Sequence, residues 1–321
     1  MKMRFWIMVL AAFLALGAVA AATTYYIDDN SNTGDVYTPG FTGNDVNNGL
    51  SPTTPKLTLN NLLASTNLLP GDIVFIDTGT YATNVVIGTN VVGAAGNRIV
   101  FQGSTNQAAG GTVLTGSGTI LLVRGRYLRF ADITAFGGAE GVTLDLAQNC
   151  EFERVFSISN GSYAIQLQSL AYTNIFRRCI AQANTAAIRT FNTARGNYFE
   201  NSIIWARAGV SMRIDLLSVS NVVDCIIMGP QAFISSLYVP DSGSRNLFWG
   251  MNSFGNDMET LADLQQINTN WYGNTVADPK FANAAAFDFH LLSAAGYVSN
   301  GVWVTNAAVG YSPGIDFGAR E

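Results

Sequence analysis

One pattern repeats in Cys150–Val155 (CEFERV), Asn174–Cys179 (NIFRRC) and Asn197–Ser202 (NYFENS), and it extends to Leu128–Ile133 (LRFADI) and Asn221–Ile226 (NVVDCI). The third position of each segment is apolar, and successive copies are 22, 24, 23 and 24 residues apart: Phe130, Phe152, Phe176, Phe199 and Val223. Internal repeats of this length are typical of solenoids, in which each repeat forms one coil that stacks on the next. We therefore expect these side chains to stack as a ladder inside the coils.

A second column of apolar residues keeps the same period. Its members are 23, 23, 22 and 23 residues apart: Val142, Ile165, Ile188, Val210 and Phe233. Short stretches of alternating apolar and polar residues in each repeat indicate strands, which would pair in parallel about 4.8 Å apart. Asn174, Asn197 and Asn221 should form a ladder of amide hydrogen bonds at a turn. A leucine-rich repeat would instead need several leucines at fixed positions in every unit.

The ends of such a solenoid need caps, because open strand edges would pair with other chains. The apolar spacing of Leu57–Leu69 predicts a short capping helix that Pro70 ends, followed by a first strand and turn in Asp72–Tyr81. Met258–Asn268 predicts a short surface helix. The expected division is a signal peptide at 1–22, an N-terminal cap region at 23–81, coils at 82–255 and an irregular C-terminal region at 256–321.

Composition limits the function. Charged residues are 12% of the chain and the net charge is −5, without a basic run, which argues against nucleic-acid binding. Lys2 and Arg4 precede an apolar run that ends near a small-x-small site at Ala18–Ala20, which predicts a cleaved signal peptide and a secreted or cell-surface protein. An uncleaved anchor is the alternative, and no later segment could span a membrane. The three cysteines are interpreted as small buried hydrophobes, with a disulfide left open.

Several further motifs resemble the pectate-lyase-like, right-handed parallel β-helix superfamily. They are Tyr25–Asp28 (YYID), Gly43–Ser51 (GNDVNNGLS), Pro70–Tyr81 (PGDIVFIDTGTY), Asp278–Leu291 (DPKFANAAAFDFHL) and Ser312–Gly318 (SPGIDFG). The resemblance covers most of the mature chain and implies an all-β, right-handed parallel β-helix with coils of about 23 residues. It specifies the fold and not the activity, because one such scaffold hosts many functions. Similar proteins usually continue beyond the last motif, so we expect a C-terminally truncated chain.

The same resemblance implies that, if the protein is an enzyme, it is a polysaccharide lyase or a glycoside hydrolase. A hydrolase needs grouped carboxylates, but the coils hold no Asp-Asp pair. A lyase needs a base and a cation, and in similar lyases Arg or Lys is the base while acidic side chains hold Ca²⁺. Because the lysines Lys56 and Lys280 lie outside the coils, Arg is the remaining choice.

The spacing places one set of candidate residues on a single strand face. Arg189 and Arg213 are the candidate catalytic residues, with Asp145, Gln168 and Asp215 as candidate substrate-binding residues. The alternative is a solvated face of weak ion pairs. A second charged column, Glu153, Arg177, Glu200 and Asp224, should pair across coils, while Arg154 and Arg178 repeat one sign beside it. Trp205 and Trp249 are among the aromatic residues that could stack on sugar rings.

One loop has the composition of a calcium site. Asp28–Asp35 (DDNSNTGD) places side-chain oxygens at Asp28, Asn30, Asn32 and Asp35, and hard cations prefer such ligands. The same residue types also form ordinary turns, which is the alternative.

Two functions therefore stay open. The first is a non-catalytic surface module that binds polysaccharide or cell-envelope glycan, or acts as a spacer. The second is a calcium-assisted lyase that acts on an acidic, uronate-containing polysaccharide. A lyase should place an arginine opposite two or more carboxylates, whereas a binding module needs no such arrangement.

Overall fold

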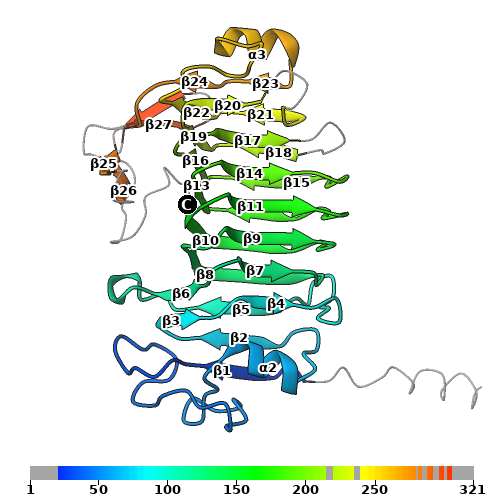
Figure 1. Ribbon diagram of the computed structural model, residues 1–321, viewed down its shortest axis with the longest axis vertical. Helices are drawn as coiled ribbons and strands as arrows, with labels where there is room; N and C mark the ends of the chain where they lie inside the picture. Colours follow the sequence, from blue (N-terminus) through cyan, green and yellow to red (C-terminus); the bar gives the residue numbers. More distant parts are fainter. Residues whose placement is uncertain are drawn as a thin grey trace, which may run out of the picture.

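The computed structural model describes residues 21–214, 220–234, 239–279, 281–283, 288–291, 296–299 and 302–305. Short strands stack in parallel along the long axis of the molecule, from β1 at one end to β24 at the other (Figure 1). The predicted parallel β-helix is thus confirmed. Its coils have three walls, because the 17-stranded sheet bends through a corner and a separate sheet of seven strands closes the coil.

The first wall contains the strands that carry the predicted ladder. They are β1 (Thr24–Ile27), β2 (Ile73–Ile76), β5 (Ile99–Gly103), the first parts of β8 (Leu128–Phe136) and β10 (Glu151–Asn160), β12 (Ile175–Arg177), β15 (Asn197–Glu200), β18 (Ser220–Val223), β21 (Ser242–Ser244) and β23 (Trp271–Tyr272).

The second wall begins where β8 and β10 bend around the corner. It contains their later parts with β3 (Gly79–Ala82), β6 (Thr112–Thr115), β13 (Ile180–Ala183), β16 (Ile203–Ala206), β19 (Ile226–Met228), β22 (Leu247–Trp249) and β24 (Thr275–Val276). The third wall is the seven-stranded sheet: β4 (Val85–Ile87), β7 (Thr119–Val123), β9 (Glu140–Asp145), β11 (Tyr163–Gln168), β14 (Ala186–Thr190), β17 (Val210–Ile214) and β20 (Gln231–Phe233).

The phenylalanine ladder stacks inside the first wall. Neighbouring rings lie 4.6–5.1 Å apart with their planes within 11° of parallel, and all are buried: Phe101, Phe130, Phe152, Phe176 and Phe199. Phe101 is a member that the repeat did not reveal. The prediction for Val223 was wrong, because Val222 pairs with Phe199 in the register. Two adjacent valines gave no sign of this one-residue shift, which exchanges the inward and outward positions of a strand.

The asparagine ladder is confirmed for Asn174 and Asn197 only. The Asn174 side-chain amide donates to Asn197 Oδ1 and to the Ala147 carbonyl, each at 3.0 Å, and its Oδ1 accepts the Cys150 N–H at 3.0 Å. The prediction for Asn221 was wrong, since Asn197 pairs with Ser220 instead. This is the same one-residue shift in register that places Val222, and not Val223, in line with Phe199.

The inward column of the third wall also differs at one coil. Ile188 of β14 pairs with Met212 of β17, and Met212 pairs with Phe233 of β20. The predicted member Val210 lies two residues earlier and pairs with Ala186. A shift of two keeps a side chain on the same face of a strand, so alternation alone could not separate these two positions.

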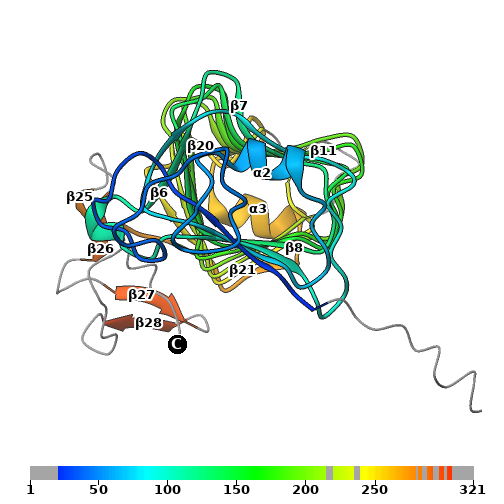
Figure 2. The same cartoon turned by 90° about the horizontal axis from the view of Figure 1, so that it is seen from below.

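Short helices lie at the two ends of the solenoid (Figures 1 and 2). α2 (Leu59–Ser65) begins at Thr58, whose side chain accepts the Asn61 N–H, and it buries Leu59 and Leu62. It is shorter than the predicted Leu57–Leu69. The predicted second helix is α3 (Leu261–Ile267), which begins with a reciprocal cap between Thr260 and Asp263. A 3₁₀ turn, η1 (Gln107–Ala109), lies in the loop before β6.

The remaining strands form antiparallel pairs beside the coils: β25 (Phe281–Asn283) with β26 (Asp288–Leu291), and β27 (Gly296–Ser299) with β28 (Val302–Thr305). Strands β1 to β3, within the predicted cap region 23–81, already belong to the walls. The SPGIDFG motif and all but the last two residues of the predicted signal peptide lie outside the described residues. Among the helices that are described, none has the length and apolar character needed to cross a membrane.

Candidate functional site

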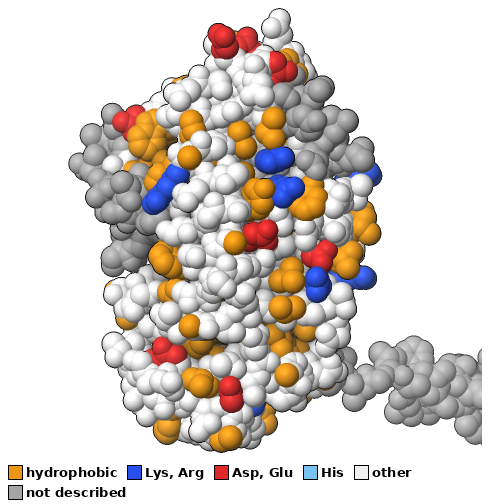
Figure 3. All heavy atoms as spheres, viewed as in Figure 1, with side chains coloured by type: hydrophobic (Ala, Val, Ile, Leu, Met, Phe, Trp, Pro, Cys, Tyr) orange, Lys and Arg blue, Asp and Glu red, His pale blue; other side chains and the backbone are white. Residues whose placement is uncertain are grey.

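The outer face of the third wall brings the two predicted arginines together. Arg189 of β14 pairs in register with Arg213 of β17 on one side and with Gln166 of β11 on the other. The sequence had placed Arg213 in line with Phe191, two residues further along the coil. Lys and Arg side chains gather over β14 and β17 in the space-filling view (Figure 3). The face therefore carries two adjacent guanidinium groups, not one arginine in line with Asp145.

Arg189 is held in place by aromatic rings. Its guanidinium carbon lies 4.8 Å from the centre of the Tyr163 ring and 4.3 Å from that of the Phe191 ring, both cation–π distances. Its Nη1 donates to Gln166 Oε1 at 3.4 Å, and its buried Nε has no hydrogen-bond partner within the described chain. No described carboxylate forms an ion pair with Arg189 or Arg213. Like charges side by side on a sheet repel each other, so an anion bound here would relieve the repulsion.

The acidic residues predicted to face Arg189 are placed differently. Asp145 Oδ2 accepts the Arg124 Nε–H at 2.9 Å, and this ion pair is part of the same face. Gln168 pairs with Asp145 in register, as the spacing predicted. Asp215 lies outside the described residues. The predicted arrangement of Arg189 opposite Asp145 is therefore not among the described ion pairs.

Glu140 is a member of this face that the sequence analysis missed. Its Oε2 accepts hydrogen bonds from the Thr119 hydroxyl at 2.8 Å, the Thr143 hydroxyl at 3.0 Å and Gln166 Nε2 at 3.4 Å. Because Gln166 Oε1 in turn accepts from Arg189, this network fixes the amide beside the guanidinium. The sequence did contain a signal for this site, because the register partners of Glu140 on the two neighbouring coils, Thr119 and Tyr163, also carry hydroxyl groups.

A groove lies at the corner between the second and third walls. We call it the tryptophan groove, and its volume is about 390 Å³. Trp205, Met228 and Trp249 follow one another in register on β16, β19 and β22, and both tryptophans are half-buried. The guanidinium carbon of Arg207 lies 5.5 Å from the centre of the Trp205 ring. The groove is lined by Trp205, Arg207, Met228, Gly229, Pro230, Trp249 and Gly250.

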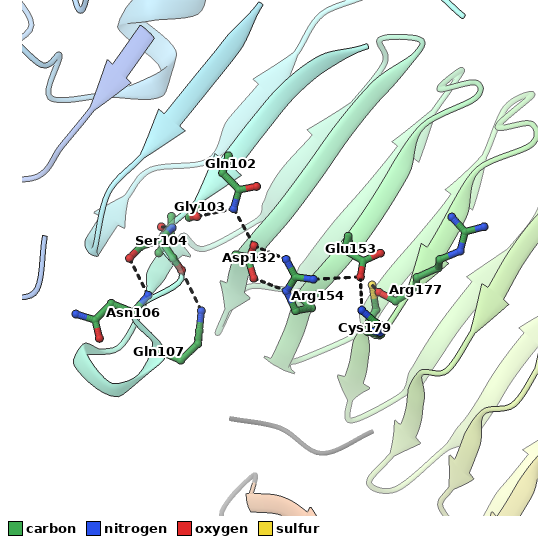
Figure 4. A network of polar contacts seen from close by, with 12 residues as sticks. Gln102, Gly103, Ser104, Asn106, Gln107, Asp132, Glu153, Arg154, Arg177 and Cys179 are labelled. Carbon is green, nitrogen blue, oxygen red and sulfur yellow. Dashed lines mark hydrogen bonds and ion pairs between the residues drawn. The ribbon is translucent and has the colours of Figure 1, made fainter. Parts of the chain in front are cut away.

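The corner between the first and second walls carries a charged network (Figure 4). Arg154 binds Asp132 through two hydrogen bonds of 2.6 and 2.7 Å and reaches Glu153 at 3.1 Å. Arg178 donates to the same Glu153 at 3.4 Å. Asp132, Arg154 and Arg178 all have left-handed φ angles between 52° and 56°, which turns the chain at this corner. The sequence showed Arg154 and Arg178 only as two like charges in neighbouring coils, whereas the structure shows that each one binds a carboxylate.

The predicted register of the charged column on the first wall is confirmed for Glu153, Arg177 and Glu200, and the ion pair within it joins Arg177 to Glu200. The Arg177 Nε lies 2.9 Å from Glu200 Oε2. Asp224 was wrongly assigned to this column, because Val223 is the register partner of Glu200. Asp224 instead forms two hydrogen bonds of 2.6 and 2.7 Å with Arg245 at the corner. We interpret these pairs as part of the scaffold.

The predicted calcium loop turns two of its three aspartates, Asp28 and Asp35, inward and leaves its asparagines outside. Asp28 is completely buried, and both carboxylate oxygens of Asp35 are buried as well. Asn30 and Asn32 are exposed. Burial raises the pKa of Asp28 to about 7, and the negative charge of Asp35 is the second cause. Burial also raises the pKa of Asp35 to about 6, with the negative charge of Asp77 as the second cause. The spacing could not show which of the four predicted side chains turn inward.

The three cysteines are buried free thiols in separate coils. Burial raises the pKa of Cys150 to about 11 and that of Cys179 to about 12, and it also raises the pKa of Cys225. The interpretation as small buried hydrophobes is confirmed. His290 lies in β26, but its side chain is outside the described part.

Comparison with known proteins gives the family. Residues 60–285, more than half of the chain, match the family model described as periplasmic copper-binding protein (NosD). The chain belongs to the NosD family. No curated protein matches this NosD-family chain.

Solved structures agree with the fold. Pectate lyase Pel9A is 15% identical with a TM-score of 0.54, and the match covers 94% of this NosD-family chain and 97% of that protein. An alginate lyase from a Paenibacillus species is 16% identical with a TM-score of 0.47, covering 62% of this chain and 89% of that one. At these identities the likeness concerns the fold alone. The likeness to the pectate lyase confirms the predicted pectate-lyase-like β-helix.

The family description raises the question of copper. Copper prefers imidazole and soft sulfur ligands. The described residues hold no cluster of three or more His, Cys, Asp or Glu side chains that could bind a metal ion. The cysteine thiols are buried in different coils, and their raised pKa values disfavour the thiolate that binds metal. The described residues therefore do not fit a copper site.

Proposed function

We propose that this NosD-family protein is an extracytoplasmic β-helix protein that binds an acidic polysaccharide on the outer face of its third wall. The observation that carries the proposal is the pair formed by Arg189 and Arg213, which lie side by side without an acidic partner in the described chain. The predicted signal peptide and the periplasmic description of the family support a location outside the cytoplasm. A surface module of this kind was the first of the two hypotheses from the sequence.

The chemistry of the face suits a uronate. A guanidinium presents parallel N–H groups that match the two oxygens of a carboxylate, and such charge-assisted bonds are stronger than neutral ones. The rings of Tyr163 and Phe191 restrict Arg189, so less conformational freedom is lost when it binds an anion. Gln168, which is half-buried on the same face, adds an amide group that can bind a sugar hydroxyl. A face that repeats from coil to coil also suits a ligand that is itself a chain.

The tryptophan groove supports the same proposal, since sugar rings pack against aromatic faces. The coil of Met228 lies between those of Trp205 and Trp249, and the two tryptophans flank a groove large enough for a sugar. Arg207, stacked near Trp205, adds positive charge at the edge of the groove.

The test is calorimetric titration of the mature protein with oligomers of polygalacturonate and alginate, and with a neutral glucan. Arg189→Gln and Arg213→Gln should each weaken binding to the acidic oligomers by about 10- to 100-fold, since a hydrogen bond to a charged group contributes about 1.5–3 kcal/mol. Arg195→Gln is the matched control, because Arg195 is exposed and lies in the turn between β14 and β15, away from the strands that carry Arg189 and Arg213. Equal loss in the control, or equal binding of the neutral glucan, would refute the proposal.

The same samples examine the calcium-assisted lyase. Lyase action creates a conjugated double bond, so ultraviolet absorbance is followed with calcium and then with chelator. The binding proposal expects a flat trace, because Asp145, the carboxylate predicted to lie in line with Arg189, is bound by Arg124 instead. A calcium-dependent rise that Arg189→Gln abolishes would replace the binding proposal with the enzyme.

A further inference from the structure

Two buried carboxylates in the loop after β1 have oxygens without partners. Asp28 is 0% exposed; its Oδ1 accepts the Asp29 N–H at 2.8 Å, while its Oδ2 accepts no hydrogen bond in the described structure. Neither carboxylate oxygen of Asp35 accepts one there, although both are buried. Three carboxylate oxygens are therefore removed from water without a hydrogen bond from the described residues. Burying a charged group in this way is costly unless a counter-charge or hydrogen bonds offset it.

A neighbouring aspartate shows what a satisfied carboxylate looks like in this loop. Asp77, directly after β2, accepts the N–H groups of Val36, Tyr37, Thr38 and Thr78 and the Thr38 hydroxyl, at 2.6–2.8 Å. Its two oxygens are thus fully used in holding the loop. Asp77 adds negative charge beside Asp28 and Asp35 but has little capacity left for another partner.

No cationic side chain of the described chain offsets this charge. Asp28 and Asp35 form no described ion pair. Lys56, the one lysine among the described residues, directs its Nζ to Asn61 Oδ1 at 2.7 Å and to the Asp45 carbonyl at 3.2 Å. The described part of the chain therefore supplies no counter-charge to Asp28 and Asp35.

We propose that Asp28 and Asp35 bind a calcium ion that ties the loop after β1 to the first coil. Calcium takes six to eight oxygen ligands in flexible geometry, so carboxylates that lie on different parts of one loop can serve it. Three acidic side chains do not converge on one point in the described chain, so the side-chain charge comes from these two, and carbonyl oxygens and water complete the shell. This ligand set differs from the sequence prediction, because the exposed Asn30 and Asn32 are not required.

Calcium binding to the chelator-treated full chain tests the proposal by titration calorimetry at neutral pH. The wild type should bind one ion, and Asp35→Asn should weaken binding at least tenfold, because it removes one of two charges while keeping the shape. Asp28→Asn should act in the same direction. Asn32→Ala is the matched control from the same loop and should leave the affinity unchanged.

Thermal unfolding supplies a second readout that works even if a variant binds too weakly to titrate. Calcium at saturating concentration should raise the unfolding midpoint of the wild type by a few degrees and leave that of Asp35→Asn unchanged, because a ligand that binds only the folded state stabilises it. The absence of calcium binding by the wild type would overturn the proposal. Loss of binding in Asn32→Ala, or full binding in Asp35→Asn, would overturn the ligand set. None of these outcomes depends on glycan binding.

Discussion

Removing one ring from the phenylalanine ladder should destabilise the protein strongly. Phe176 is 0% exposed, and its ring lies 4.6 Å from that of Phe152 and 4.8 Å from that of Phe199. Phe176→Ala leaves a cavity between two coils that are fixed by strand pairing, so the site cannot collapse to fill it. A buried Phe→Ala substitution costs about 3–5 kcal/mol, a range that includes the lost stacking. We expect a loss near the middle of that range.

Urea unfolding followed by far-ultraviolet circular dichroism measures this loss, and two variants make it specific. Phe136→Ala is the matched control, because Phe136 at the end of β8 is 42% exposed and should cost less than about 1 kcal/mol. Phe176→Leu keeps an apolar side chain and should lie between the two. A cost for Phe176→Ala no greater than that for Phe136→Ala would refute the claim that the ladder is the packed core.

Two further predictions use buried polar groups. In the same assay, Asn174→Ala should lower the free energy of unfolding by about 2–4 kcal/mol, because it leaves the Cys150 N–H and the Ala147 carbonyl without their partner. Asn221→Ala is the control outside the ladder and should lower it by about 1 kcal/mol or less. The reverse order would contradict the register. The three thiols should not react with an aromatic disulfide reagent at mildly alkaline pH in the native protein, since burial raises their pKa values, and all three should react in concentrated guanidinium chloride. Rapid labelling of the folded protein would show that the coils open.

The sequence predicted more of the fold than of the site, and the reason lies in how each is specified. Phe130, Phe152, Phe176 and Phe199 recur because each coil must bury one ring against the next. A burial requirement repeated in every coil is visible as a period. The shift from Val223 to Val222 was not visible, because either valine satisfies the same requirement.

The candidate site depends on pairings that a period cannot specify. Arg213 lies beside Arg189 because Met212, and not the predicted Val210, is the register partner of Ile188. Asp145 is bound by Arg124, one coil earlier, and not by an arginine later in the chain. Such pairings follow from loop lengths and register, and alternation of apolar and polar residues is unchanged by a shift of two.

The amino-acid sequence by itself determined the parallel β-helix, its period and the residue types of its ladders, because burial and strand alternation repeat locally in every coil. Only the tertiary structure decided that Arg189 and Arg213 are neighbours, that Arg154 and Arg178 bind acidic residues, and that Asp28 and Asp35 turn inward while Asn30 and Asn32 face water. The physical reason is that charge and hydrogen-bonding partners are set by which coils meet in register, and that register is fixed by the whole stack and not by any one repeat.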